Sequence, residues 1–263
     1  IIMLAVAIPL KKDYNIEQLL RSLAGIQNVI VMDGGSSNDT LKKVQAVSKE
    51  LGMKLYFYRC SNFNHDAEFK NKLLKICDKY DFGHYLMVDC NQKLSNVKSL
   101  CEFVNNNKSD GYEMIYETST TDGIIQKKTL GVIKNREGWN YSGSVYPRLQ
   151  NDVSVKVISV PRNVCLIVET YIEKSQTQLK EDKKKLENEE SVTFDKIEIN
   201  IELEEWNTVI DLCNKLELTD KEDIYRSRLV KAEMLMKLDK PWEEVFISLW
   251  KAWECMNTVE PLL

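Results

Sequence analysis

The chain has 263 residues, of which 43% are hydrophobic and 29% are charged. This is the composition of a folded protein with a substantial core, and it excludes a disordered chain. The formal net charge of -4 gives no reason to expect nucleic acid or an anionic membrane surface as a partner. The seven cysteines form no C-x-x-C pair, which favours free thiols in a reducing compartment over disulfides or a zinc site.

The first residues form an apolar run that is too short to span a bilayer, and no basic segment or cleavage site accompanies it. We therefore interpret residues 3–10 as the first buried strand and expect a cytoplasmic protein. Pro9 and the polar residues after it end this strand. Asn15 is expected to cap an amphipathic helix that Gly25 closes.

The most informative stretch is residues 29–40, where an apolar run breaks into a small polar turn. Residues 29–32 fit a buried strand, and Gly34 with Gly35 permits a sharp turn with positive φ. The turn presents the carboxylate of Asp33 and backbone N–H groups at the carboxyl end of a sheet, where α/β folds bind nucleotides. The helix after the turn is expected to begin near residue 41, with its cap at Asn38, Asp39 or Thr40.

Strand and helix signals continue to alternate up to residue 104. Strands are predicted at 55–58 and 85–89, and helices at 66–80 and 95–104, the second capped by Ser95. This repetition predicts a mostly parallel, doubly wound sheet. After Gly111, strand-like segments follow one another without long helices, which indicates an antiparallel extension; they are residues 112–117, 129–134, 153–160 and 164–168.

Strand signals end near residue 171, so we predict one domain at 1–170 and a small all-α region of helical hairpins at 171–263. The charged run at 180–190 fits a solvated helix face or a linker. Trp206 and Trp242 begin two similar segments 36 residues apart, close to the period of about 34 residues in tetratricopeptide hairpins. A packed helical appendage is favoured over a groove for a protein partner, and both remain open.

The segment Asp89-Cys90-Asn91 ends the fourth predicted strand. An enzyme that uses nucleotide sugars needs a divalent cation at such a place, to bridge the diphosphate and neutralise the leaving group. One carboxylate and one amide can bind a hard cation through oxygen. We therefore predict Mn²⁺ or Mg²⁺, held by Asp89 and Asn91.

These segments resemble family 2 glycosyltransferases, which have the Rossmann-like GT-A fold, in a subgroup with a tetratricopeptide-like tail. The resemblance spans residues 3 to 149, and the Asp-Gly-Ser turn is its most specific part. It is carried by four blocks, at 5–10, 33–40, 67–71 and 87–91, and by two later segments, at 134–135 and 143–146.

The resemblance implies a role for several residues. Pro9 and Asp33 would flank the nucleotide base, with Asp33 accepting a hydrogen bond from a uracil-like imide and Gly35 in the same turn. Asp89 would lie near the metal and the ribose. Lys70 and Asn71 would lie near the phosphates or the sugar; Tyr146 belongs to the acceptor-side segment.

Further residues are suggested by their chemistry alone. An inverting transfer needs a carboxylate base for the acceptor hydroxyl. The acidic residues of the acceptor half are Asp110, Glu117, Asp122 and Glu137, and Glu137 in a glycine-containing loop is the candidate that we name. Trp139 and Tyr141 have rings that can stack on an acceptor sugar, although ordinary packing explains them equally well.

The function predicted first is therefore transfer of a sugar from a nucleotide donor, with UDP expected, to an acceptor hydroxyl of a glycan, a protein or a small molecule. The alternative is a degenerate GT-A protein that acts as an interaction module through its helical tail. It rests on Lys70 in place of an arginine, Asn91 in place of an acidic residue, and Tyr146 in place of a histidine. A nucleotidyltransferase ranks last, because no glycine-rich loop follows the first strand.

Overall fold

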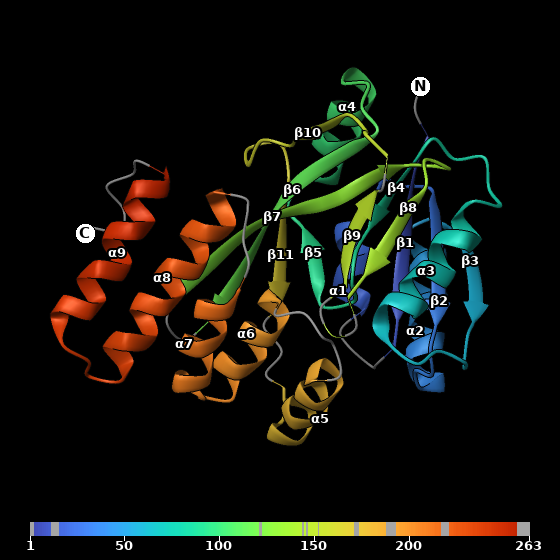
Figure 1. Ribbon diagram of the computed structural model, residues 1–263. Helices are drawn as coiled ribbons and strands as arrows, with labels where there is room; N and C mark the ends of the chain where they lie inside the picture. The colour runs from blue at the N-terminus through green and yellow to red at the C-terminus, as the bar shows by residue number, and fades with distance from the viewer. Residues whose placement is uncertain are drawn as a thin grey trace. The chain divides into compact units, whose positions relative to one another are not determined.

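The computed structural model describes residues 3–11, 16–120, 123–143, 145, 147–151, 153–170, 174–187, 193–216 and 221–256. The chain divides into two compact units, Ile1–Ile172 and Glu173–Leu263 (Figure 1). The first unit contains all the described strands, and the second contains only helices among its described residues.

The main sheet of the first unit is mixed and has the order β3-β2-β1-β4-β7-β6-β11-β5, with β10 beside β6. Its parallel half consists of β1 (Leu4–Leu10), β2 (Asn28–Asp33), β3 (Lys54–Arg59) and β4 (His84–Met87). Antiparallel pairing begins between β4 and β7, which confirms the predicted extension. The remaining strands are β5 (Gln92–Leu94), β6 (Gly111–Thr120), β7 (Gly123–Lys134), β10 (Val157–Ser159) and β11 (Leu166–Thr170).

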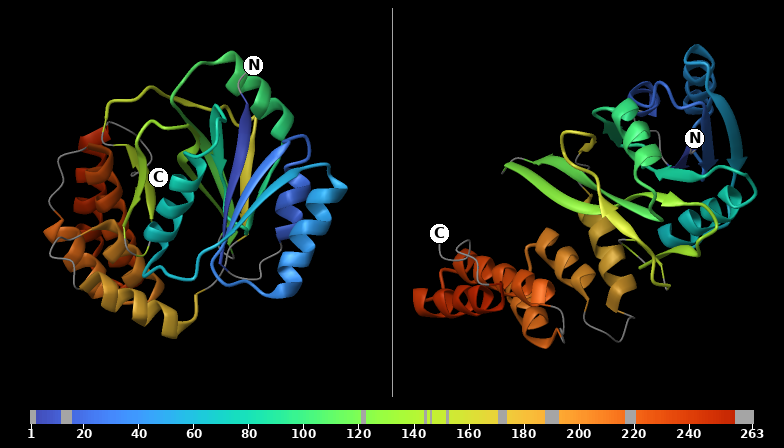
Figure 2. Two further views of the ribbon diagram at one scale, coloured as in Figure 1. Left: turned by 90° about the vertical axis from the view of Figure 1, so that its right-hand side faces the viewer. Right: turned by 90° about the horizontal axis from the view of Figure 1, so that it is seen from above.

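Helices cover both faces of the parallel half, because its strands bury side chains on both sides. The helices α1 (Ile16–Ser22), α2 (Asn38–Glu50) and α4 (Val97–Asn106) share one apolar core with Val6 and Ile8 of β1. On the opposite face, α3 (Asp66–Cys77) packs against the small side chains Ala5 and Ala7. Figure 2 shows α3 on one side of the parallel strands, and α1 with α2 on the other.

Two helix caps differ from the predictions. The helix α2 begins at Asn38 and is capped by Ser37, whose side chain accepts a hydrogen bond of 3.3 Å from the Thr40 amide. The helix α4 is capped by Asn96 instead of Ser95. Ser95 exchanges two hydrogen bonds with Leu166, so it pairs with β11 instead of capping the helix. The expected cap Asn15 lies outside the described residues.

A separate two-stranded sheet, β8 (Trp139–Ser142) with β9 (Arg148–Asn151), was not predicted from the sequence. Its apolar residues pack against the core that α3 also covers. The long strand expected at 153–160 is reduced to β10, which pairs with the start of β6.

The second unit is a series of helices in which each described helix contacts the next along the chain. They are α5 (Gln176–Glu187), α6 (Phe194–Glu202), α7 (Trp206–Lys215), α8 (Lys221–Lys237) and α9 (Trp242–Met256). The charged run falls largely in α5, whose Leu179 and Leu186 are buried, so the predicted solvated helix face is correct. In the described part of the chain, no helix combines the length and the apolar character needed to cross a bilayer.

The two tryptophans of the predicted repeat each begin a helix, Trp206 in α7 and Trp242 in α9. The Lys237 ammonium lies 4.6 Å from the ring centre of Trp206, whereas Trp242 is 62% exposed. Phe246 and Trp250 continue the exposed aromatic row along α9, and we call these three residues the α9 aromatic face. The tetratricopeptide-like interpretation of this unit stays a prediction.

Replacing Leu73 by alanine should lower the free energy of unfolding by about 2–5 kcal/mol, because it opens a cavity under α3 where Leu73 is fully buried. Urea unfolding followed by circular dichroism measures the change. Lys75→Ala on the exposed side of the same helix is the matched control, and we expect it to stay within about 0.5 kcal/mol of the unaltered chain. Equal losses in both variants would contradict this packing.

Candidate functional site

The turn after β2 holds the carboxylate of Asp33 inside the protein, with only 4% of the residue exposed. Its Oδ1 accepts hydrogen bonds from the backbone amides of Gly35, at 3.1 Å, and Ser36, at 2.8 Å. The other oxygen, Oδ2, lies 3.8 Å from Nε of the exposed Arg59 at the end of β3. One oxygen therefore fixes the turn, and the second faces the edge of the sheet.

The two glycines of this turn are needed for different reasons. Gly35 has φ of +119°, a backbone conformation that other residues rarely adopt. At Gly34, a Cβ atom would lie 3.0 Å from the ring of Phe69 and 3.1 Å from that of Phe63. The turn therefore packs directly beneath the first turn of α3 and the loop before it.

The strand order places a topological switch point between β1 and β4. From β1 the chain proceeds to β2 and β3 on one side, and it then returns to β4 on the other side of β1. Ligands of open α/β sheets bind outside the carboxyl ends of the strands at such a point. Here Pro9 is the last residue but one of β1, and its carbonyl accepts a hydrogen bond of 3.3 Å from Sγ of Cys90. Burial raises the pKa of the Cys90 thiol, which keeps this donor protonated.

Asp89 lies at this switch point and forms an ion pair with Lys70. The Nζ atom of Lys70, on α3, is 2.8 Å from Oδ2 of Asp89. The same ammonium lies 5.2 Å from the ring centre of Tyr141 on β8. Three elements thus fix one cation next to the predicted nucleotide site. The lysine side chain is 12% exposed and the aspartate side chain 39%.

A network of polar side chains holds the backbone of Asp89 in place. Gln92 accepts a hydrogen bond of 2.9 Å from the Asp89 amide and donates one of 3.0 Å to Glu169 on β11. The other carboxylate oxygen of Glu169 accepts from Thr118, at 3.1 Å, and from Lys127, at 3.2 Å. Sequence reasoning missed this network because its members are distant in sequence and only the sheet order brings them together.

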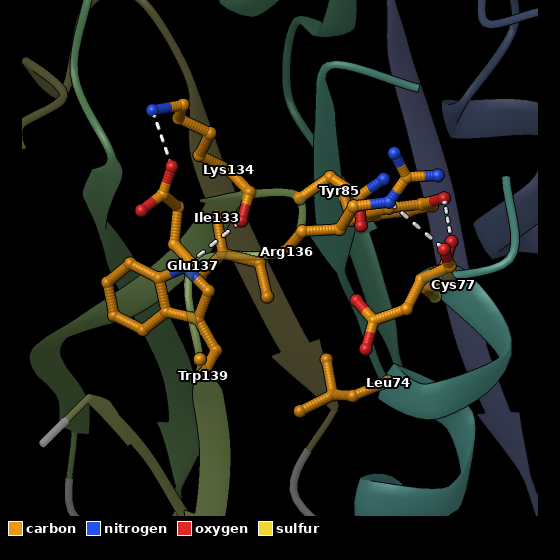
Figure 3. A pocket seen from close by; sticks show the side chains of 11 residues that line it. Leu74, Cys77, Tyr85, Ile133, Lys134, Arg136, Glu137 and Trp139 are labelled. Carbon is orange, nitrogen blue, oxygen red and sulfur yellow. Dashed lines mark hydrogen bonds and ion pairs between the residues drawn. The ribbon is translucent and has the colours of Figure 1, made fainter. Parts of the chain in front are cut away.

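The predicted base and one predicted acceptor residue lie elsewhere. Glu137 follows β7, whose Lys134 pairs in register with His84 at the opposite end of β4 from Asp89. In Figure 3, Glu137 and Trp139 line a pocket at that end. The Lys134 ammonium lies 2.6 Å from Oε1 of Glu137, and the Lys134 carbonyl accepts a hydrogen bond from the indole N–H of Trp139. Glu137 therefore lies away from the end of β4 that Asp89 follows, and the roles given to Glu137 and Trp139 stay predictions. Tyr146 lies outside the described residues.

No protein-family model matches the chain, and no curated protein matches it in sequence. Among solved structures, residues 1–349 of S. aureus TarS in complex with UDP-GlcNAc are similar, with a TM-score of 0.50 and 16% identity over 89% of this chain and 72% of that chain. The first unit has the GT-A fold.

The mannosyltransferase PcManGT from Pyrobaculum calidifontis, in complex with GDP-Man and Mn²⁺, is also similar, with a TM-score of 0.46 and 12% identity over 99% of this chain and 77% of that chain. We use the name GT-A unit for Ile1–Ile172 from here on.

The predicted metal ligands of the GT-A unit do not form a divalent metal site as they stand. The carboxylate of Asp89 is paired with Lys70, and the side-chain nitrogen of Asn91 donates a hydrogen bond of 3.1 Å to the Thr170 carbonyl. Among the described residues, no group of three or more histidine, cysteine, aspartate or glutamate side chains could hold a metal ion. A divalent cation prefers several oxygens that carry negative charge, and this cluster offers a neutralised carboxylate and one amide oxygen.

Asn71, the neighbour of Lys70, binds backbone instead of facing the sheet edge. Its amide nitrogen donates to the Tyr141 carbonyl at 2.8 Å, and its oxygen accepts from the Tyr141 amide at 2.7 Å. The side chain thereby imitates a neighbouring strand and attaches β8 to α3. Because β8 carries the Tyr141 ring that faces Lys70, this contact also positions the ion pair. The predicted contact of Asn71 with the donor stays a prediction.

Asn71→Ala should destabilise the protein by about 1–3 kcal/mol, because it leaves the amide and carbonyl of Tyr141 without their partners. Hydrogen exchange of the Tyr141 amide should also become faster. Thermal unfolding and exchange mass spectrometry measure the two effects, with Lys75→Ala as the control on the same helix. An unchanged exchange rate at β8 would show that Asn71 does not hold this strand.

Proposed function

We propose that the GT-A unit transfers a sugar from a nucleoside diphosphate donor, with UDP as the nucleotide, to an acceptor hydroxyl. The observation that carries the proposal is the pair of carboxylates at the carboxyl ends of β2 and β4, on either side of the switch point. The strands that carry them are separated only by β1, so the two sites are roughly 10 Å apart across the sheet. The likeness of this unit to TarS in complex with UDP-GlcNAc supports the same reading.

Asp33 is the residue that we assign to the base. Its Oδ1 is occupied by the two turn amides, and we assign Oδ2, which lies 3.8 Å from Nε of Arg59, to accept a hydrogen bond from the imide N–H of uracil. A carboxylate fixed in this way recognises a donor N–H without rearrangement. Pro9 and Gly35 belong to the backbone around the same base, and the amide-rich turn into α2 adds a favourable place for negative charge.

The chemistry proposed is a direct displacement at the anomeric carbon of the sugar. The bond from this carbon to the diphosphate oxygen breaks, a bond to the acceptor oxygen forms, and the configuration inverts. The leaving diphosphate gains negative charge, which the Lys70 ammonium is placed to offset. The acceptor proton passes to a carboxylate base. Glu137 is not assigned this role, because it lies at the far end of β4 from Asp89.

A second candidate function is protein interaction through the helical unit. The observation in its favour is the α9 aromatic face, in which Trp242, Phe246 and Trp250 are 62%, 43% and 41% exposed. Exposed aromatic side chains that adjoin one another are typical of surfaces that bind a partner. This function does not require the GT-A unit to be active. It becomes the principal one if the nucleotide titration described next shows no binding.

Asp33→Ala should weaken UDP binding by about 10- to 100-fold, because it removes a charged hydrogen-bond acceptor from the base. Isothermal titration calorimetry with UDP, in buffer that contains Mn²⁺, measures the change. The matched control is Asp39→Ala in the first turn of α2, whose carboxylate is 86% exposed, and we expect an unchanged affinity. Equal affinities of the two variants would refute the assignment of Asp33, and no UDP binding by the unaltered chain would refute the function.

A further inference from the structure

The ion pair of Lys70 with Asp89 leads to an inference that rests on the proposed function. A divalent cation in a nucleotide-sugar site places positive charge between a protein carboxylate and the diphosphate. Here the carboxylate of Asp89 already has a cation 2.8 Å away, and that cation belongs to the protein. We propose that Lys70 takes the place of the divalent metal ion and that this chain binds the diphosphate of its donor without a metal.

The surroundings of Lys70 hold the ammonium in a fixed position. Its carbon stem lies on α3, and the side chain is only 12% exposed. The carboxylate of Asp89 contacts it on one side, and the ring face of Tyr141 lies 5.2 Å away. Tyr141 is in turn tied to α3 by Asn71, the next residue along the helix. A cation restrained from several sides needs little rearrangement to meet a phosphate.

The ammonium also retains the hydrogen-bonding capacity that the role requires. A lysine side chain has three N–H donors, and the contact with Asp89 uses one of them. A ring face attracts the charge without consuming a donor. Lysine binds phosphate as a compact point charge, so it supplies one positive charge to the diphosphate without the geometry of a metal site.

The rest of the cluster is consistent with a site that contains no divalent ion. Asn91 stands where a second carboxylate would be needed, and its amide nitrogen is bonded to the Thr170 carbonyl. Glu169, the nearest further carboxylate in the network, accepts from Gln92, Thr118 and Lys127. Both of its carboxylate oxygens therefore already have donors from the protein. A metal ion at Asp89 would lie close to the Lys70 ammonium, and the two positive charges would repel each other.

The decisive experiment is calorimetric titration of the full chain with UDP, once in EDTA and once in MnCl₂. We expect the two dissociation constants to agree within about twofold, because the protein supplies the cation itself. Binding that requires Mn²⁺ would overturn this inference while leaving the proposed function intact. No binding in either buffer would overturn both, so the two failures are distinguishable.

Lys70→Met tests the residue directly, because methionine keeps most of the length of the side chain and removes its charge. In EDTA we expect the variant to bind UDP at least about tenfold more weakly than the unaltered chain. Its affinity for UMP, which lacks the second phosphate, should stay unchanged. Lys75→Met, with an exposed side chain on the same helix, should bind both nucleotides normally. An equal loss for UMP and UDP would indicate a structural role for Lys70 and would overturn the assignment.

Discussion

Asp33 is buried at the carboxyl end of β2, and a buried carboxylate has to be hydrogen-bonded where it lies. The amides of Gly35 and Ser36 meet this need, and they can do so only if the chain turns sharply at Gly35 with positive φ. The turn leads at once into α2, whose Ser37 cap continues the same run of backbone donors. The hydrogen bonds of the Asp33 carboxylate thus explain why glycine stands at position 35 and why the turn leads directly into α2. They lie at the edge of the sheet where the proposed nucleotide would bind.

After the end of β4, Asp89 obtains its polar partners in another way. The carboxylate of Asp89 forms an ion pair with Lys70 from α3, and the backbone amide of Asp89 donates a hydrogen bond to the Gln92 side chain. Because α3 returns over the face opposite to α1 and α2, the crossover that creates the switch point also delivers Lys70. Fold topology and electrostatics are therefore connected in this unit: the chain places its fixed cation where its strand order would place a ligand.

The sequence predicted best what depends on neighbouring residues. The turn after β2, the first four strands and the change to antiparallel pairing follow from local apolar runs and glycines. Prediction from the sequence failed where the partner of a residue is distant in the sequence. The segments of β8 and β9 are only four residues long, and Ser95 has its role through Leu166 rather than through its own helix. Nothing in the sequence reveals at which end of β4 Glu137 lies.

The contact between Asn71 and Tyr141 has a consequence for solubility. In a sheet of two strands, each strand has an outer edge whose N–H and C=O groups can pair with a strand of another molecule. At Tyr141 both of these groups are taken by the amide of Asn71, so a helix side chain closes the edge of β8 against a neighbouring chain. The side chain that holds Tyr141 beside Lys70 thus also occupies one position at which a foreign strand could add.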